Sequence, residues 1–98
     1  MTDRKRTRIP TEFKAGGLEG RGKVRNVSEG GLFVGTREIP PQGETVMLSL
    51  SVPGRQPIEV SGMVWWTTQD GGRHADPGFG LRILDEDDEY RRMVDGLA

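Results

Sequence analysis

The chain has 98 residues, a length typical of a single domain, and 33% of them are hydrophobic, enough for one modest core. It contains no cysteine, which excludes disulfide bonds, thiolate metal sites and cysteine nucleophiles. The apolar runs are only a few residues long and the N-terminus lacks the apolar stretch of a signal peptide, so we expect a cytoplasmic protein outside the membrane.

The net charge of −1 hides an uneven distribution of charged side chains. Residues 1–25 carry eight Lys or Arg against three Asp or Glu, whereas residues 26–98 carry six against twelve. A basic segment on an acidic body favours a compact polyanion as ligand, because the acidic body would repel a long phosphate backbone running across it. A solvated basic tail without a ligand would account for the charge equally well.

Short segments separated by turn residues predict an all-β fold. The chain has 15 glycines and 6 prolines, which interrupt it at short intervals. We expect residues 1–9 to form a flexible basic arm and residues 10–98 to form the folded domain. The predicted strands, in chain order, are residues 11–15, 22–27, 32–36, 44–52, 58–66 and 78–84.

Residues 44–52 and 58–66 show the clearest strand pattern. Apolar residues occupy every second position in both segments, which is the period of a half-buried strand, and Pro53-Gly54 can turn the chain between them. We therefore expect a long hairpin. In its second strand Trp66 shares the inward-facing positions of Ile58 and Val64, which predicts that Trp66 belongs to the core.

The last part of the chain predicts an exposed loop, a strand and a helix. Residues 67–77 are polar and rich in turn formers, so we expect them to be an exposed loop. Residues 85–89 are acidic, and acidic side chains stabilise the first turn of a helix through its dipole. The apolar residues that follow have helical spacing and could cap a barrel: Tyr90, Met93, Val94 and Leu97.

The residues that catalysis requires are largely missing from the sequence. The one histidine, His74, lies in the polar loop, and a lone loop histidine is more often a solvated side chain than a zinc ligand. Neither a Walker-type phosphate loop nor a dinucleotide-binding glycine motif occurs. We therefore expect a protein that is not an enzyme and has no metal site.

Two motifs point to a ligand. In Arg4-Lys5-Arg6-Thr7-Arg8, the guanidinium groups can bind phosphate oxygens or the O6/N7 edge of guanine. In Asn26-Val27-Ser28-Glu29-Gly30-Gly31, the amide and the hydroxyl can face one side of a strand, and the glycines let the backbone approach a ligand. Taken alone, the second motif is better explained as a turn that stabilises a β-corner. The similar RxxxR spacing of residues 21–25 predicts only a charged strand face.

In this order the two motifs resemble the PilZ family, whose signature is RxxxR followed by [D/N]xSxxG. The similarity extends to the strand that ends at Trp66, to residues 77–82 and to the terminal helix with its acidic start, so it covers residues 3 to 95. The resemblance implies a six-stranded antiparallel barrel with a short C-terminal helix, and cyclic di-GMP as the ligand.

The resemblance also implies which residues form the site. Arg4 and Arg8 would hold phosphate and guanine. Asn26 and Ser28 would contact a guanine edge, and Lys5 and Arg6 would add charge near the phosphates. Asp3 stands where many relatives have another arginine, and Asn26 replaces an aspartate, so we expect weaker contacts than in those relatives. The implied ligand-binding residues are Arg4, Lys5, Arg8, Asn26, Ser28, Gly30, Gly31 and Trp66.

The mechanism that we expect is ordering of the basic arm over the barrel by cyclic di-GMP, with the changed surface acting on an effector protein in bacterial motility or biofilm regulation. One alternative is a PilZ-like adaptor in pilus assembly or motility that uses no nucleotide; the intact motif residues argue against it. Another is a small nucleic-acid-binding barrel, which the scarcity of basic residues around the aromatic segments disfavours.

Overall fold

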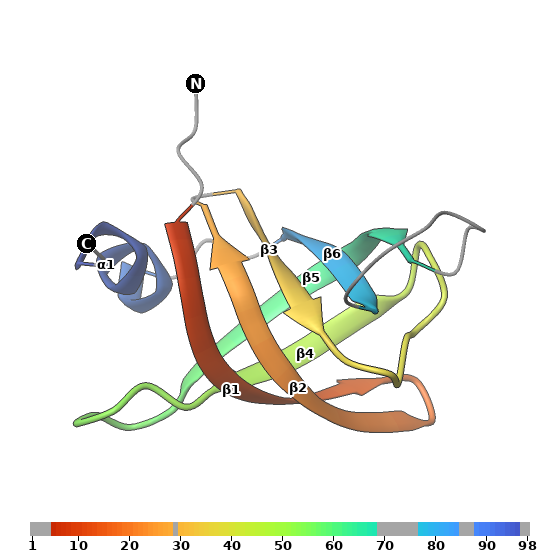
Figure 1. Ribbon diagram of the computed structural model, residues 1–98, viewed down its shortest axis with the longest axis horizontal. Coiled ribbons are helices and arrows are strands. Elements are labelled where there is room, and N and C mark those ends of the chain that lie inside the picture. Colours follow the sequence, from red (N-terminus) through yellow and green to blue (C-terminus); the bar gives the residue numbers. More distant parts are fainter. Residues whose placement is uncertain (1–4, 29, 69–76, 85–87, 97–98) are drawn as a thin grey trace.

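The computed structural model describes residues 5–28, 30–68, 77–84 and 88–96. Residues 1–4 of the predicted arm, most of the predicted loop with His74, and residues 85–87 lie outside the described residues. The elements, shown in Figure 1, are β1 (Lys5–Ala15), β2 (Leu18–Val27), β3 (Gly31–Gly35), β4 (Thr45–Leu50), β5 (Ile58–Thr67), β6 (Gly78–Ile83) and α1 (Asp88–Gly96). The predicted six strands and terminal helix are confirmed.

The six strands form one closed antiparallel barrel in the order β1-β2-β3-β6-β5-β4 (Figure 1). β1 pairs with β2 on one edge and with β4 on the other, and this second pairing closes the ring. The predicted long hairpin is confirmed as β4–β5, in which Leu50 lies opposite Ile58 and Thr45 lies opposite Met63. Each strand of the closed barrel therefore has one face that points inward and one face that points outward.

Alternating side chains fill the inside of the barrel, as the period of two predicts. Phe13 of β1 and Phe79 of β6 meet edge to face inside it, with ring centroids 5.3 Å apart. α1 lies at the end of the barrel where β1 begins (Figure 1) and contributes three side chains to the same core: Tyr90, Met93 and Val94. In the described ranges, no helix has the length and apolar character needed to cross a membrane.

β1 is longer than the sequence pattern predicts, because it begins at Lys5 and not at Thr11. Lys5 lies opposite Val27, Arg6 opposite Asn26 and Ile9 opposite Val24, with a register shift between Arg6 and Ile9, so this part of the predicted arm belongs to β1. The predicted boundary between arm and barrel at residue 9 is therefore not a boundary of the fold. The pairing with β4 covers residues 11–14, and just beyond it the carbonyl oxygen of Pro10 accepts from the amide of Ser51 at 2.9 Å. Pro10 has no amide to donate, so it fits at this end of the pairing, where only its carbonyl group is used.

We expect Phe13→Leu to lower the free energy of unfolding by about 1–2 kcal/mol, because it removes the edge-to-face contact with Phe79 and leaves a cavity. Denaturant titration followed by circular dichroism measures the change. Met47→Ala is the control, since Met47 is 54% exposed on the neighbouring strand and its truncation should change stability by less than about 0.5 kcal/mol. Equal losses in the two variants would contradict the proposed packing of the core.

Candidate functional site

The outer face of the β1–β2 hairpin has two halves with different charge balance. Near the tip, Lys14 pairs with Glu19 and Arg21 pairs with Glu12, each with an N–O distance of 3.6 Å. The half near the start of β1 exposes four basic side chains: Arg6, Arg8, Lys23 and Arg25. These four cations lie close together on one face, and a local excess of positive charge among the described residues attracts anions.

The second predicted motif forms a tight turn between β2 and β3, next to the basic half of the hairpin. The amide of Ser28 donates to the carbonyl oxygen of Gly31 at 2.8 Å, and its hydroxyl donates to the same oxygen at 3.3 Å. The amide of Ile83 in β6 donates to the carbonyl oxygen of Gly30 at 3.0 Å, which fixes the turn to the neighbouring strand. Ser28 is only 6% exposed, so its hydroxyl has the turn-stabilising role that the motif taken alone predicts.

A row of facing residues joins the hairpin to the other side of the barrel. Arg6 lies opposite Asn26, Asn26 lies opposite Phe33, Phe33 lies opposite Gly80, and Gly80 lies opposite Trp66. The row crosses five strands on the outer face, and it brings a guanidinium, a carboxamide and two aromatic rings onto one surface. These groups can contact phosphate, a base edge and a base face respectively.

Trp66 is 39% exposed, so the prediction that it belongs to the core is wrong. The pairing of β5 with β6 shifts register between Val64 and Trp66, which leaves Trp65 as an extra residue in β5. A shift of one residue turns every later side chain to the opposite face. Val64 therefore points inward, and both tryptophans point outward.

Glycines in β6 let the two aromatic rings lie flat on the sheet. A Cβ atom on Gly80 would collide with the indole of Trp66, and a Cβ atom on Gly78 would come within 2.7 Å of the ring of Phe33. The rings of Phe33 and Trp66 stack with their centroids 5.2 Å apart and an interplanar angle of 17°. The partly exposed pair forms an aromatic platform beside Asn26.

A groove of about 230 Å³ lies between the turn and the tryptophans. The guanidinium carbon of Arg82 in β6 lies 5.1 Å from the centroid of the Trp65 ring, a cation–π arrangement that holds a cation at the groove. The lining residues are Ser28, Gly30, Gly31, Leu32, Trp65, Trp66, Gly80, Leu81 and Arg82. Three further residues of this surface, Phe33, Trp65 and Arg82, were not predicted as site residues. The alternation along β3 and β6 places Phe33 and Arg82 on the outer face and could have indicated them.

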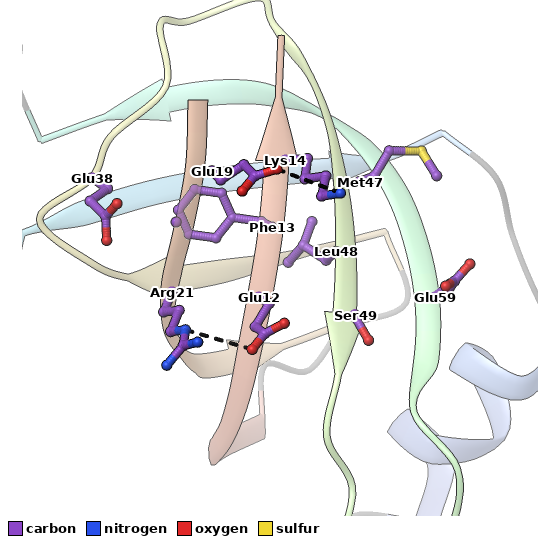
Figure 2. A pocket seen from close by; sticks show the side chains of 11 residues that line it. Glu12, Phe13, Lys14, Glu19, Arg21, Glu38, Met47, Leu48, Ser49 and Glu59 are labelled. Atoms are coloured by element: carbon purple, nitrogen blue, oxygen red, sulfur yellow. Dashed lines mark ion pairs between the residues drawn. The ribbon is translucent and has the colours of Figure 1, made fainter. Parts of the chain in front are cut away.

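A larger groove, of about 590 Å³, lies on the outer face of β1, β2, β4 and β5 and is shown in Figure 2. Its cations are the two that pair with Glu12 and Glu19, and Glu38 and Glu59 add further negative charge. An acidic groove repels phosphate, so the smaller groove and the basic half of the hairpin are the better candidates for an anion site. Among the described residues, no group of three His, Cys, Asp or Glu side chains could hold a metal ion.

The structure brings together half of the predicted ligand-binding residues. Ser28, Gly30, Gly31 and Trp66 line the smaller groove. Asn26 lies in the row beside it, and Arg8 is exposed on β1. Lys5 instead donates from Nζ to the carbonyl oxygen of Val94 in α1 at 2.7 Å. Arg4 lies outside the described residues.

Comparison with known proteins gives one family and one fold. The family model described as PilZ domain matches residues 2–98. Among solved structures, the Bacillus subtilis inhibitor of motility (MotI/DgrA) is similar, with a TM-score of 0.74 and 18% sequence identity. The match covers 96% of this chain and 46% of that chain, so the present chain spans about half the length of that structure. No curated protein matches the sequence.

The two glycines of the turn give a matched pair of variants. A Cβ atom on Gly31 would lie 2.6 Å from the carbonyl oxygen of Leu81, so Gly31→Ala forces β3 away from β6 and should cost about 1–3 kcal/mol of stability. Gly30 has no atom within 4 Å of such a Cβ and no positive φ, so Gly30→Ala should change stability by less than about 0.5 kcal/mol. Thermal unfolding of both variants tests the difference, and similar midpoints would contradict it.

Proposed function

Because the chain belongs to the PilZ domain family, we propose that it is a receptor for cyclic di-GMP and a binding module, not an enzyme. The observation that carries the proposal is the group of four exposed cations on the β1–β2 hairpin beside the Ser28–Gly31 turn. Cyclic di-GMP has two phosphates and two guanines, which need cations and base contacts at a short distance from each other. The structure supports this ligand by having both kinds of group on one outer surface.

Arginines of the RxxxR motif contact the phosphates in this proposal. Arg8 is exposed on β1, and Arg4 belongs to the same motif four positions earlier. Arg6 lies opposite Asn26 and is therefore placed to help bind a phosphate of the same ligand. Planar guanidinium groups suit this task because they donate two parallel hydrogen bonds to phosphate or to the O6/N7 edge of guanine.

The guanine bases contact the turn and the aromatic platform. Asn26 supplies a carboxamide that can accept from a guanine amino group or donate to its O6 atom. Trp66 and Phe33 offer a stacked, partly exposed surface next to Asn26, and base stacking on such rings contributes about 1–3 kcal/mol per base. Ser28, Gly30 and Gly31 line the groove between these groups, and they shape the edge against which a base lies.

The proposed ligand site lies on one outer surface of a small barrel, where a second protein can contact it. We propose that ligand binding orders the residues before Lys5 over this surface, and that an effector protein recognises the result. The Bacillus subtilis structure with the same fold is an inhibitor of motility, and control of motility or biofilm formation is the setting that we propose for this chain.

Arg8→Ala should weaken cyclic di-GMP binding by about 1.5–3 kcal/mol, about ten- to a hundredfold in Kd, because it removes a charge-assisted contact. Isothermal titration calorimetry measures the two affinities. Lys14→Ala is the matched control, because Lys14 lies on the same strand and pairs with Glu19 in the other half of the hairpin. Equal affinity of wild type and Arg8→Ala would refute the proposed site, and the absence of binding by wild type would favour the nucleotide-independent adaptor.

Trp66 should report ligand binding by its fluorescence. Trp65→Phe leaves Trp66 as the single tryptophan, and a guanine that stacks on it should quench its emission with a saturation curve that matches the calorimetric Kd. Trp66→Ala should weaken binding by about 1–3 kcal/mol, the contribution of one stacked base. An unquenched Trp66 in a protein that binds the ligand would exclude stacking at the platform.

A further inference from the structure

Helix α1 contacts the Ser28–Gly31 turn through one buried hydroxyl. Tyr90 is 2% exposed, and its hydroxyl lies 2.8 Å from the carbonyl oxygen of Ser28 and 3.2 Å from that of Gly31. The single phenolic proton can be shared between these two oxygens, which are 62 and 59 positions away in the chain. The conformation of the turn therefore depends on a side chain of α1.

The same helix also contacts the start of β1, the strand that carries Arg6 and Arg8, through Lys5. The Nζ atom of Lys5 donates to the carbonyl oxygen of Val94 at 2.7 Å. Carbonyl groups in the last turn of a helix have no partner within the helix, and α1 has acidic residues in its first turn but no basic residue in its last. Lys5, from the start of β1, supplies the cation that this helix end lacks, and α1 in turn fixes the place where the RxxxR segment enters the barrel.

We propose that α1 holds two parts of the cyclic di-GMP site, the Ser28–Gly31 turn and the start of β1, in their relative position. Tyr90 and Lys5 are the positioning residues. The inference rests on the proposed function. Tyr90 fixes the turn, and Lys5 fixes the strand that carries Arg6 and Arg8. A site held in its bound shape before the ligand arrives loses less conformational freedom on binding, so the two contacts raise ligand affinity without touching the ligand.

The coupling also acts in the opposite direction. If docking of α1 strengthens ligand binding, then by thermodynamic linkage ligand binding strengthens the docking of α1 by the same factor. Opening of α1 is local unfolding, and it exposes its backbone amides to exchange with solvent. Cyclic di-GMP should therefore slow hydrogen exchange in residues 91–95, although these residues lie outside the groove.

A third contact of α1 provides a matched control. Arg55, in the connection between β4 and β5, pairs with Glu89 at 3.7 Å, and both side chains are substantially exposed. This pair also links the helix to the barrel, but Arg55 belongs neither to the Ser28–Gly31 turn nor to the start of β1. Arg55→Gln should therefore leave ligand affinity unchanged.

The experiment compares wild type with Tyr90→Phe, Lys5→Met and Arg55→Gln in two measurements. Calorimetric titration with cyclic di-GMP should show Kd values about three- to tenfold higher for Tyr90→Phe and Lys5→Met, and an unchanged Kd for Arg55→Gln. Hydrogen exchange with and without cyclic di-GMP should show slower exchange of residues 91–95 in the wild-type complex. That protection should shrink in Tyr90→Phe, which keeps the buried ring and loses only the hydroxyl.

A wild-type affinity in both Tyr90→Phe and Lys5→Met would overturn the inference, and so would a wild-type complex whose α1 exchanges as fast as in the free protein. If one variant does not fold, the other still tests one of the two contacts. A wild type that fails to bind cyclic di-GMP would overturn the proposed function together with the coupling. A lower affinity in Tyr90→Phe and Lys5→Met, with an unchanged affinity in Arg55→Gln, would support the inference.

Discussion

The pairing of β1 with β4 closes the barrel, and the position of every other group follows from this closure. Residues 11–14 of β1 lie opposite residues 47–50 of β4, and the hydroxyl of Thr11 adds a hydrogen bond of 2.9 Å to the carbonyl oxygen of Ser49. A small closed barrel is filled by its own side chains, so it has no internal space for a dinucleotide. Groups that recognise a ligand must lie on the outside, and α1 must cover an open end.

Departures from regular pairing concentrate where the candidate site lies. The register shifts between Arg6 and Ile9 in β1, between Val24 and Asn26 in β2, and between Val64 and Trp66 in β5. Such bulges re-aim side chains and are frequent beside functional sites. In β5 the shift moves Trp66 from the inside to the outside, onto the row that starts at Arg6. Irregular pairing thus gathers the candidate ligand contacts, while regular alternation builds the core.

The sequence was sufficient to predict the strands, the long hairpin, the turn and the helix, because each depends on local periodicity or on turn residues. The exposure of Trp66 was not predictable from the alternating pattern, since the bulge at Trp65 depends on how β5 pairs with β6 and does not change that pattern. The contact of Tyr90 with the turn joins residues far apart in the chain, so no local pattern contains it. The start of β1 was misplaced because Pro10 suggests an end to pairing, whereas Pro10 lies opposite Lys23 of β2 and its carbonyl oxygen accepts from the amide of Ser51.

The alternation along β1 and β2 separates the residues that fill the core from the residues of the proposed ligand site. Inward-facing Phe13 and Val24 fill the core, while the cations near the turn stand on the opposite face of the same two strands. Mutations can therefore remove or replace those cations during evolution without loss of the fold. A barrel of this kind could therefore lose the proposed nucleotide site and keep only a protein-docking surface through changes on its outer face, with its core unchanged.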